Sequence, residues 1–159
     1  MKNTLLLLFL FFACHAFSQV NAVLPSEAKT FYENAMLRIK PQFKNLIEKN
    51  ANKLTGHKIN VDSLMIELQK NPLLKGKNEK DMEAITVLIL VQVSRNVDNN
   101  LKEMVIHKKN DGNENEADNQ REKNYASLLV ENKSEIAQNV SFIMKKLSVS
   151  SQTVMDKFK

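Results

Sequence analysis

The chain has 159 residues, with three glycines, three prolines, one cysteine and no tryptophan, and its formal net charge is +5. So few turn-forming residues argue against a fold of many short strands, and the length fits a single domain. Basic residues are spread along the sequence without a dense block or a stripe interleaved with aromatic residues, so a nucleic-acid partner is not expected.

The N-terminus has the pattern of a secretory signal peptide. Lys2 gives a basic start, residues 5–13 form an apolar run, and residues 16–18 (Ala-Phe-Ser) form a small-x-small cleavage site. Residues 1–18 are therefore predicted to be removed, which leaves a mature chain of residues 19–159. The apolar run of nine residues is much shorter than the ~20 that cross a bilayer, so no transmembrane span is expected in the mature chain.

Cys14 offers an alternative, because a lipoprotein signal is cut just before a cysteine that then carries the lipid. The residues before it, Phe11-Phe12-Ala13, do not fit that signal well, so ordinary cleavage after Ser18 is favoured. The mature chain then has no cysteine for a disulfide, a thiol nucleophile or a zinc site. It loses Lys2 and keeps 22 basic and 18 acidic residues, and this charge of +4 weakly favours acidic surfaces as partners.

The first helix is predicted to begin at Pro25-Ser26 and to continue through Pro41. Its apolar residues recur at helical spacing along one face: Ala28, Phe31, Tyr32, Ala35, Ile39, Phe43, Leu46, Ile47 and Leu54. Proline removes one backbone hydrogen bond, so we expect a kink at Pro41; a split into two helices is the alternative. Gly56 is the expected C-terminal stop.

A shorter helix is predicted from Asn60, with its apolar positions at Val61, Leu64, Met65 and Leu68, and Asn71-Pro72 ends it. The Leu73-Leu74 pair that follows is expected to pack as a plug in a loop. Asn78, with Asp81 three residues later, is the expected N-cap of the next helix.

The central helix is predicted over residues 82–107, and we expect it to form the core of the fold. Its main apolar stripe is formed by Ile85, Ile89, Val93 and Val97, whereas Val87, Leu88 and Val91 point to the other side. One neighbouring helix cannot cover both sides, so we expect the first and last helices to enclose the central one. The alternative is that Val87, Leu88 and Val91 form an exposed patch for self-association or for a protein partner.

Residues 110–121 are polar and rich in Asn, Asp and Glu, so a flexible loop is predicted there. The last helix then presents one apolar face made of Tyr125, Leu129, Ile136, Val140, Ile143 and Leu147, which Val154 and Phe158 continue. Asn132 falls on this stripe, and we place it at the surface edge; a buried amide that fixes the register of the helices is the alternative. Glu131, Glu135, Gln138 and Lys145 form the solvated face.

The residues that could carry chemistry do not form a recognisable site. His57 lies in a helix-exit loop, and His107 with Glu103 supplies only two metal ligands. Asp111 to Glu122 matches a calcium-binding EF-hand loop at four oxygen-ligand positions, but Glu116 stands where glycine is required. Glu131 and Glu135 are expected on a polar face where nothing raises a carboxyl pKa. We therefore assign no catalytic, cofactor-binding or metal-binding residue and expect no cofactor.

The sequence thus predicts an exported, all-α protein, an up-down bundle of about four helices with the first helix kinked at Pro41. The expected role is a non-catalytic protein–protein interaction module that is periplasmic or secreted. A small helical protein that binds an apolar ligand or lipid is the alternative, with the ligand between the central helix and its neighbours. An envelope hydrolase ranks last.

Overall fold

The computed structural model describes residues 23–110, 116–147 and 156–159, with the side chains of residues 107–110 and 116–119 left out of the description. The predicted signal peptide, Cys14 and Val154 lie outside these ranges. The described chain is helical: α2 (Ser26–Arg38), α3 (Pro41–Leu54), α4 (Val61–Gln69), the 3-10 helix η1 (Pro72–Leu74), α5 (Glu79–Asn110) and α6 (Glu116–Leu147). The prediction of an all-α fold is confirmed for this part of the chain.

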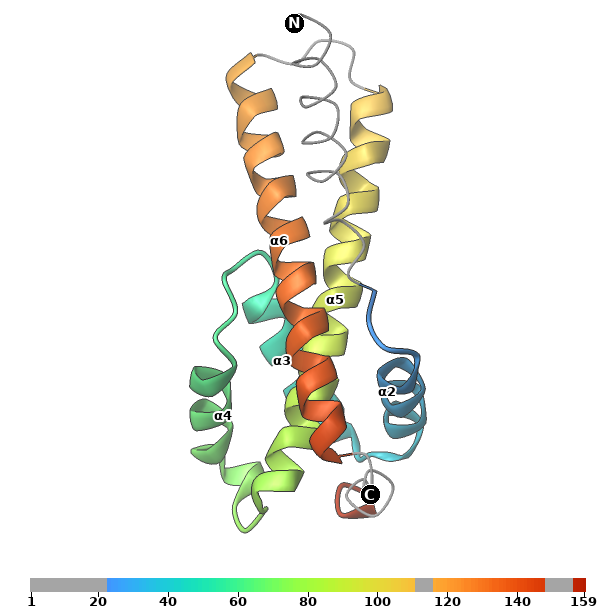
Figure 1. Cartoon of the computed structure of the whole chain (residues 1–159), viewed down its shortest axis with the longest axis vertical. Coiled ribbons are helices and arrows are strands. Elements are labelled where there is room, and N and C mark those ends of the chain that lie inside the picture. The colour runs from blue at the N-terminus through green and yellow to red at the C-terminus, as the bar shows by residue number, and fades with distance from the viewer. Residues whose placement is uncertain (1–22, 111–115, 148–155) are drawn as a thin grey trace, which may run out of the picture.

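The two long helices α5 and α6 run antiparallel and form the axis of the molecule (Figure 1). The helix α5 contacts α2, α3, α4 and α6, so each of the other described α-helices packs on it. In the view of Figure 1, α2 and α4 lie on opposite sides of this axis. The joined ends of α5 and α6 project beyond the shorter helices, so the core sits in the other half of the molecule.

Pro41 divides the first predicted helix into two. The helix α2 ends at Arg38, Ile39 and Lys40 have ψ angles of 149°, and Pro41 is the first residue of α3. A proline disfavours helical backbone in the residue before it, whereas at the first position of a helix it loses no hydrogen bond. The expected single kinked helix is therefore replaced by α2 and α3, and the described chain has five α-helices rather than about four.

The predicted starts of two helices, α4 and α5, are held by side-chain hydrogen bonds, whereas the start of α2 has no side-chain cap. The side chain of Asn60 accepts a hydrogen bond from the Ser63 amide at 2.8 Å at the start of α4. At the start of α5, the Asp81 amide donates to the Asn78 side chain and the Asn78 amide donates to the Asp81 carboxylate, each at 3.0 Å. This reciprocal pair satisfies two backbone N–H groups that the helix itself cannot.

The core forms around the first half of α5. Residues 81–91 of this helix are all buried, and Val87, Leu88 and Val91 are fully enclosed by protein. The prediction that neighbouring helices cover both sides of the central helix is confirmed, since α3 and α6 both pack on it. The suggested partner-binding patch of Val87, Leu88 and Val91 is therefore wrong, because these side chains do not reach the surface.

The polar loop is shorter than predicted. The helix α5 continues to Asn110 and α6 begins at Glu116, so only residues 111–115, which lie outside the description, separate them. Residues 116–121 were expected in the loop but are helical. Ala117, Gln120 and Arg121 are strong helix formers, and this preference outweighs the Asn and Asp residues between them.

Candidate functional site

A row of polar residues follows one side of α5 beyond its buried half. Gln92, Asn96, Asn99 and Glu103 recur at steps of three and four residues, which places them along one face of the helix. The end of α3 lies opposite this row. Together the two helices form an open groove of about 420 Å³ that is lined by Asn52, Thr55, Asn96, Asn99, Asn100 and Glu103.

Hydrogen bonds fix the inner wall of this amide groove. The Tyr32 hydroxyl of α2 donates to Gln92 Oε1, and Gln92 Nε2 donates to Asn96 Oδ1 at 2.9 Å. Asn96 Nδ2 in turn donates to Asn52 Oδ1 at 2.9 Å and to Thr55 Oγ1 at 3.2 Å. The chain of bonds connects α2, α5 and α3, so it orients the amide of Asn96 from both ends. The wall is therefore preorganised before any ligand arrives.

The outer wall carries groups that face solvent. Asn99 and Glu103 are exposed at the rim, and the amide nitrogen of Asn52 keeps donor capacity beyond the bond that its oxygen accepts. Each amide offers a donor and an acceptor, and the carboxylate of Glu103 offers acceptors alone. Chemically, this arrangement can bind a polar partner through several directed hydrogen bonds.

Tyr125 of α6 stands at the edge of the groove. Asn100 Nδ2 donates to its hydroxyl at 3.4 Å, and its ring lies against Gly56 at the turn after α3. A Cβ atom at Gly56 would lie 2.9 Å from the Tyr125 hydroxyl, and Gly56 also has φ +80°. Glycine is thus required for the turn and for the close approach. Tyr125 was predicted on the apolar face of the last helix, but it is exposed.

Asn132 is buried, which corrects its predicted position at the surface edge. Its Nδ2 donates at 2.8 Å to the backbone carbonyl of His57, in the loop between α3 and α4. The buried polar group here is the Asn132 amide on the apolar face of α6, and the loop carbonyl gives it a hydrogen-bond partner. The alternative reading, a buried amide that fixes packing, is the one that the structure supports.

The residues that the sequence offered for chemistry do not come together. His57 is exposed in its loop, Glu103 lies in the amide groove, and the side chain of His107 is outside the description. Glu131 is exposed and Glu135 is partly buried, both on α6. Residues 111–115 of the calcium-like stretch are not described, and its last residue, Glu122, lies within α6. Among the described residues, no group of three His, Cys, Asp or Glu side chains is placed to hold a metal ion.

No family model, curated protein or solved structure matches the chain. No helix within the described ranges is both long enough and apolar enough to cross a membrane.

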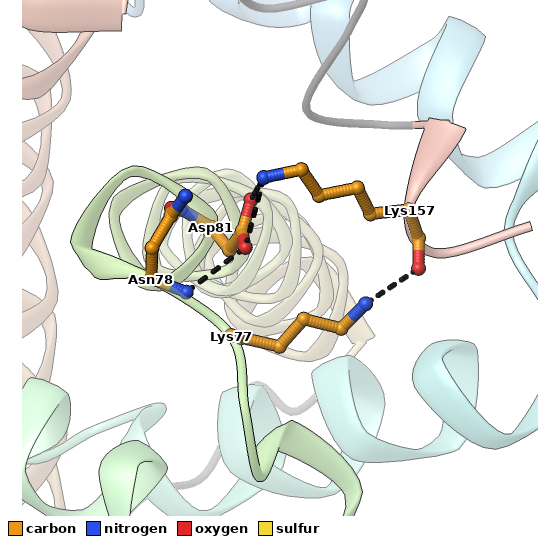
Figure 2. Close-up of polar contacts among 4 residues, drawn as sticks. All are labelled: Lys77, Asn78, Asp81 and Lys157. Carbon is orange, nitrogen blue, oxygen red and sulfur yellow. Dashed lines mark hydrogen bonds and ion pairs between the residues drawn. The ribbon is translucent and has the colours of Figure 1, made fainter.

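A second polar cluster lies at the start of α5, where residues 156–159 dock (Figure 2). Lys157 Nζ lies 2.9 and 3.2 Å from the two carboxylate oxygens of the buried Asp81. Lys77 Nζ donates to the carbonyl of Lys157 at 2.7 Å. Asp81 thus has two roles, since the carboxylate that caps α5 also holds the C-terminal segment.

Phe158 anchors this segment in the core. Its side chain is fully buried, and its ring meets that of Phe43 edge to face at 5.1 Å between centroids. The carbonyl of Phe158 accepts a hydrogen bond from the Lys40 amide at 2.9 Å. That amide is available because the break before Pro41 leaves Lys40 outside both helices. The sequence predicts Phe158 in the core stripe. The contacts of Phe158 with Lys40 and of Lys157 with Asp81 could not be predicted from neighbouring residues in the sequence.

Proposed function

We propose that this protein is an exported, non-catalytic binding module that holds a protein partner at the amide groove between α3 and α5. The observation that supports the proposal is the groove wall, in which Asn96 is oriented by bonds on both sides while Asn99 and Glu103 face solvent. The fixed wall needs no ordering when a partner binds, and the exposed Asn99 and Glu103 supply the groups that would contact it.

A peptide segment suits this groove better than a small apolar ligand. Each amide pairs a donor with an acceptor, as the backbone of a peptide does. Ile106 continues the α5 row one step beyond Glu103 and is 58% exposed, so an apolar contact adjoins the polar ones. Protein interfaces commonly combine an apolar anchor with directed hydrogen bonds. By contrast, the alternative function needs room for an apolar ligand between α5 and its neighbours. That space is occupied by buried side chains such as Leu88.

Export is part of the same proposal and is supported by the N-terminal pattern of Lys2, residues 5–13 and residues 16–18. We expect the mature protein to begin at Gln19 and to work in the periplasm or outside the cell. Intact mass spectrometry of the secreted product tests this. A product that retains the apolar run, or one with a diacyl group on Cys14, would overturn it.

The groove is tested by photo-crosslinking in the producing cells. A benzophenone amino acid replaces Asn99 at the groove or, as the matched control, the exposed Asn45 of α3. We expect a discrete protein adduct from position 99 and none from position 45. The adduct should disappear when Glu103→Arg is added, because the arginine fills the rim and reverses its charge. Equal adducts at both positions, or an adduct that survives Glu103→Arg, would contradict the proposed site.

A further inference from the structure

Contacts between distant segments assemble one end of the molecule. The break between α2 and α3 meets the C-terminal segment through Lys40 and Phe158, and the connector before α5 meets it through Lys77. The end of α6 joins them, since Lys146 Nζ lies 3.3 Å from Glu83 Oε1. Figure 1 shows these segments together at the end of the molecule where the C-terminus lies. We call this the basic end and define it as residues 38–40, 70–83, 145–146 and 156–159.

Positive charge is concentrated at the basic end. Its four segments contain ten Lys or Arg residues and four acidic residues. Of the 23 basic and 18 acidic residues in the whole chain, this leaves thirteen basic and fourteen acidic for all the rest. The net positive charge of the protein therefore comes from this one end. The sequence alone did not reveal this, because the four segments are far apart along the chain.

Two of the four acidic side chains of the basic end, those of Asp81 and Glu83, are buried, whereas Glu79 and Asp156 are exposed. Asp81 is buried against Lys157, and Glu83 is buried against Lys146. Asp156 pairs with Lys159. In contrast, Lys40, Lys70, Lys75 and Lys80 are exposed. The outward-facing charge is thus mainly positive, and the exposed Leu73 of η1 lies among these lysines along the chain.

We propose that the basic end docks on the surface of a bilayer containing anionic phospholipid. Its charges are dispersed over four segments on long side chains, which suits a fluid array of headgroups. Lysines near an anionic bilayer contribute to binding individually, and an exposed leucine can enter the headgroup region beside them. The fourteen residues of α3 lead from this end to the amide groove, a distance of about 20 Å at 1.5 Å per residue. Binding in this way would hold the groove at a distance from the membrane surface.

The test is vesicle co-sedimentation of the exported chain. We expect binding to vesicles of phosphatidylcholine and phosphatidylglycerol, little binding to pure phosphatidylcholine, and steep loss as salt is raised. The double variant Lys75→Gln/Lys80→Gln should bind about 25-fold more weakly, at about fivefold per lysine. The matched control, Lys49→Gln/Lys58→Gln, removes two exposed lysines from outside the basic end and should bind like the wild type.

Two further measurements distinguish a specific loss of vesicle binding from a loss of folding and test the contribution of Leu73. Circular dichroism and melting of both double variants should match the wild type, since all four lysines are exposed. Leu73→Ser should weaken vesicle binding without changing its salt dependence. Equal binding to neutral vesicles, or equal loss in both double variants, would overturn the proposal. If soluble polyglutamate bound as tightly as the vesicles and with the same loss in Lys75→Gln/Lys80→Gln, the assignment to lipid would be overturned in favour of an acidic polypeptide.

Discussion

The side chain of Asn132 contributes to the stability of the fold through one hydrogen bond between distant segments. Replacing it by alanine removes the bond to the His57 carbonyl, and a hydrogen bond of this kind contributes about 0.5–1.5 kcal/mol. We expect Asn132→Ala to lower the free energy of unfolding by that amount in urea denaturation. Asn139→Ala, on the same helix, is the control and should stay within about 0.5 kcal/mol of the wild type. Equal effects would mean that the bond to His57 contributes nothing.

Tyr32 gives a pH-dependent prediction. Burial raises the pKa of its phenol above the ordinary 10.0; the nearby Arg95 guanidinium opposes this rise and Glu48 adds to it. The unfolded chain therefore loses this proton at lower pH than the folded chain. The stability that Tyr32 contributes is complete below pH 10.0 and is lost as the pH rises through the folded-state pKa.

The chain has two tyrosines, so Tyr125→Phe leaves Tyr32 as the only phenol. Ultraviolet titration of this variant should show a phenolate that forms above pH 10.0 in the folded state. Melting temperatures measured across the same range should fall less steeply in Tyr32→Phe than in wild type. A tyrosine that titrates at its ordinary value would refute the burial effect.

At the scale of an element, α5 is enclosed by four helices, and this makes its buried half intolerant of charge. Leu88→Asp places an unpaired carboxylate among side chains that are fully buried. Such a charge costs about 3–5 kcal/mol, a large share of a total stability of ~5–15 kcal/mol. We expect loss of the helical circular dichroism signal or a strongly lowered melting temperature.

Ile66→Asp is the matched control for this substitution, because Ile66 lies on the outer side of α4 and is 52% exposed. It should melt close to the wild type. If Leu88→Asp also melted like the wild type, α5 could not be the central helix of the bundle.

The break between α2 and α3 changes the direction of the chain and also provides a binding position for the C-terminal segment. Because Lys40 is not helical, its N–H is free to bind Phe158, and the two helices part at the place where the C-terminal segment enters. One proline thus determines both the number of helices and a docking position for a segment more than a hundred residues away.

For the whole molecule, the C-terminal segment closes the core. Phe158→Ala removes a fully buried ring that packs on Phe43, and such truncations cost about 3–5 kcal/mol. We expect a large drop in the melting temperature with one cooperative transition, since the segment belongs to the same core. Phe142→Ala removes a ring that is 62% exposed and should have little effect. Similar shifts in the two variants would show that the docked segment is not part of the cooperative unit.

The features that the sequence by itself determined are those that depend on neighbours along the chain. Helical spacing of apolar residues and the scarcity of glycine and proline were enough to predict an all-α fold. The Asn60 cap, the Asn78 and Asp81 pair and the turn at Gly56 were predictable because each joins residues within a few positions. The burial of Leu88 followed as well, because an apolar helix face must be covered.

Only the tertiary structure decided the features that join distant segments. The bond from Asn132 to His57 spans 75 positions, and the pair of Lys157 with Asp81 spans 76. The amide groove needs the end of α3 beside the middle of α5, and the basic end needs four separate segments at one pole. Local residue preferences carry no information about such pairings, because they depend on how whole helices pack against each other.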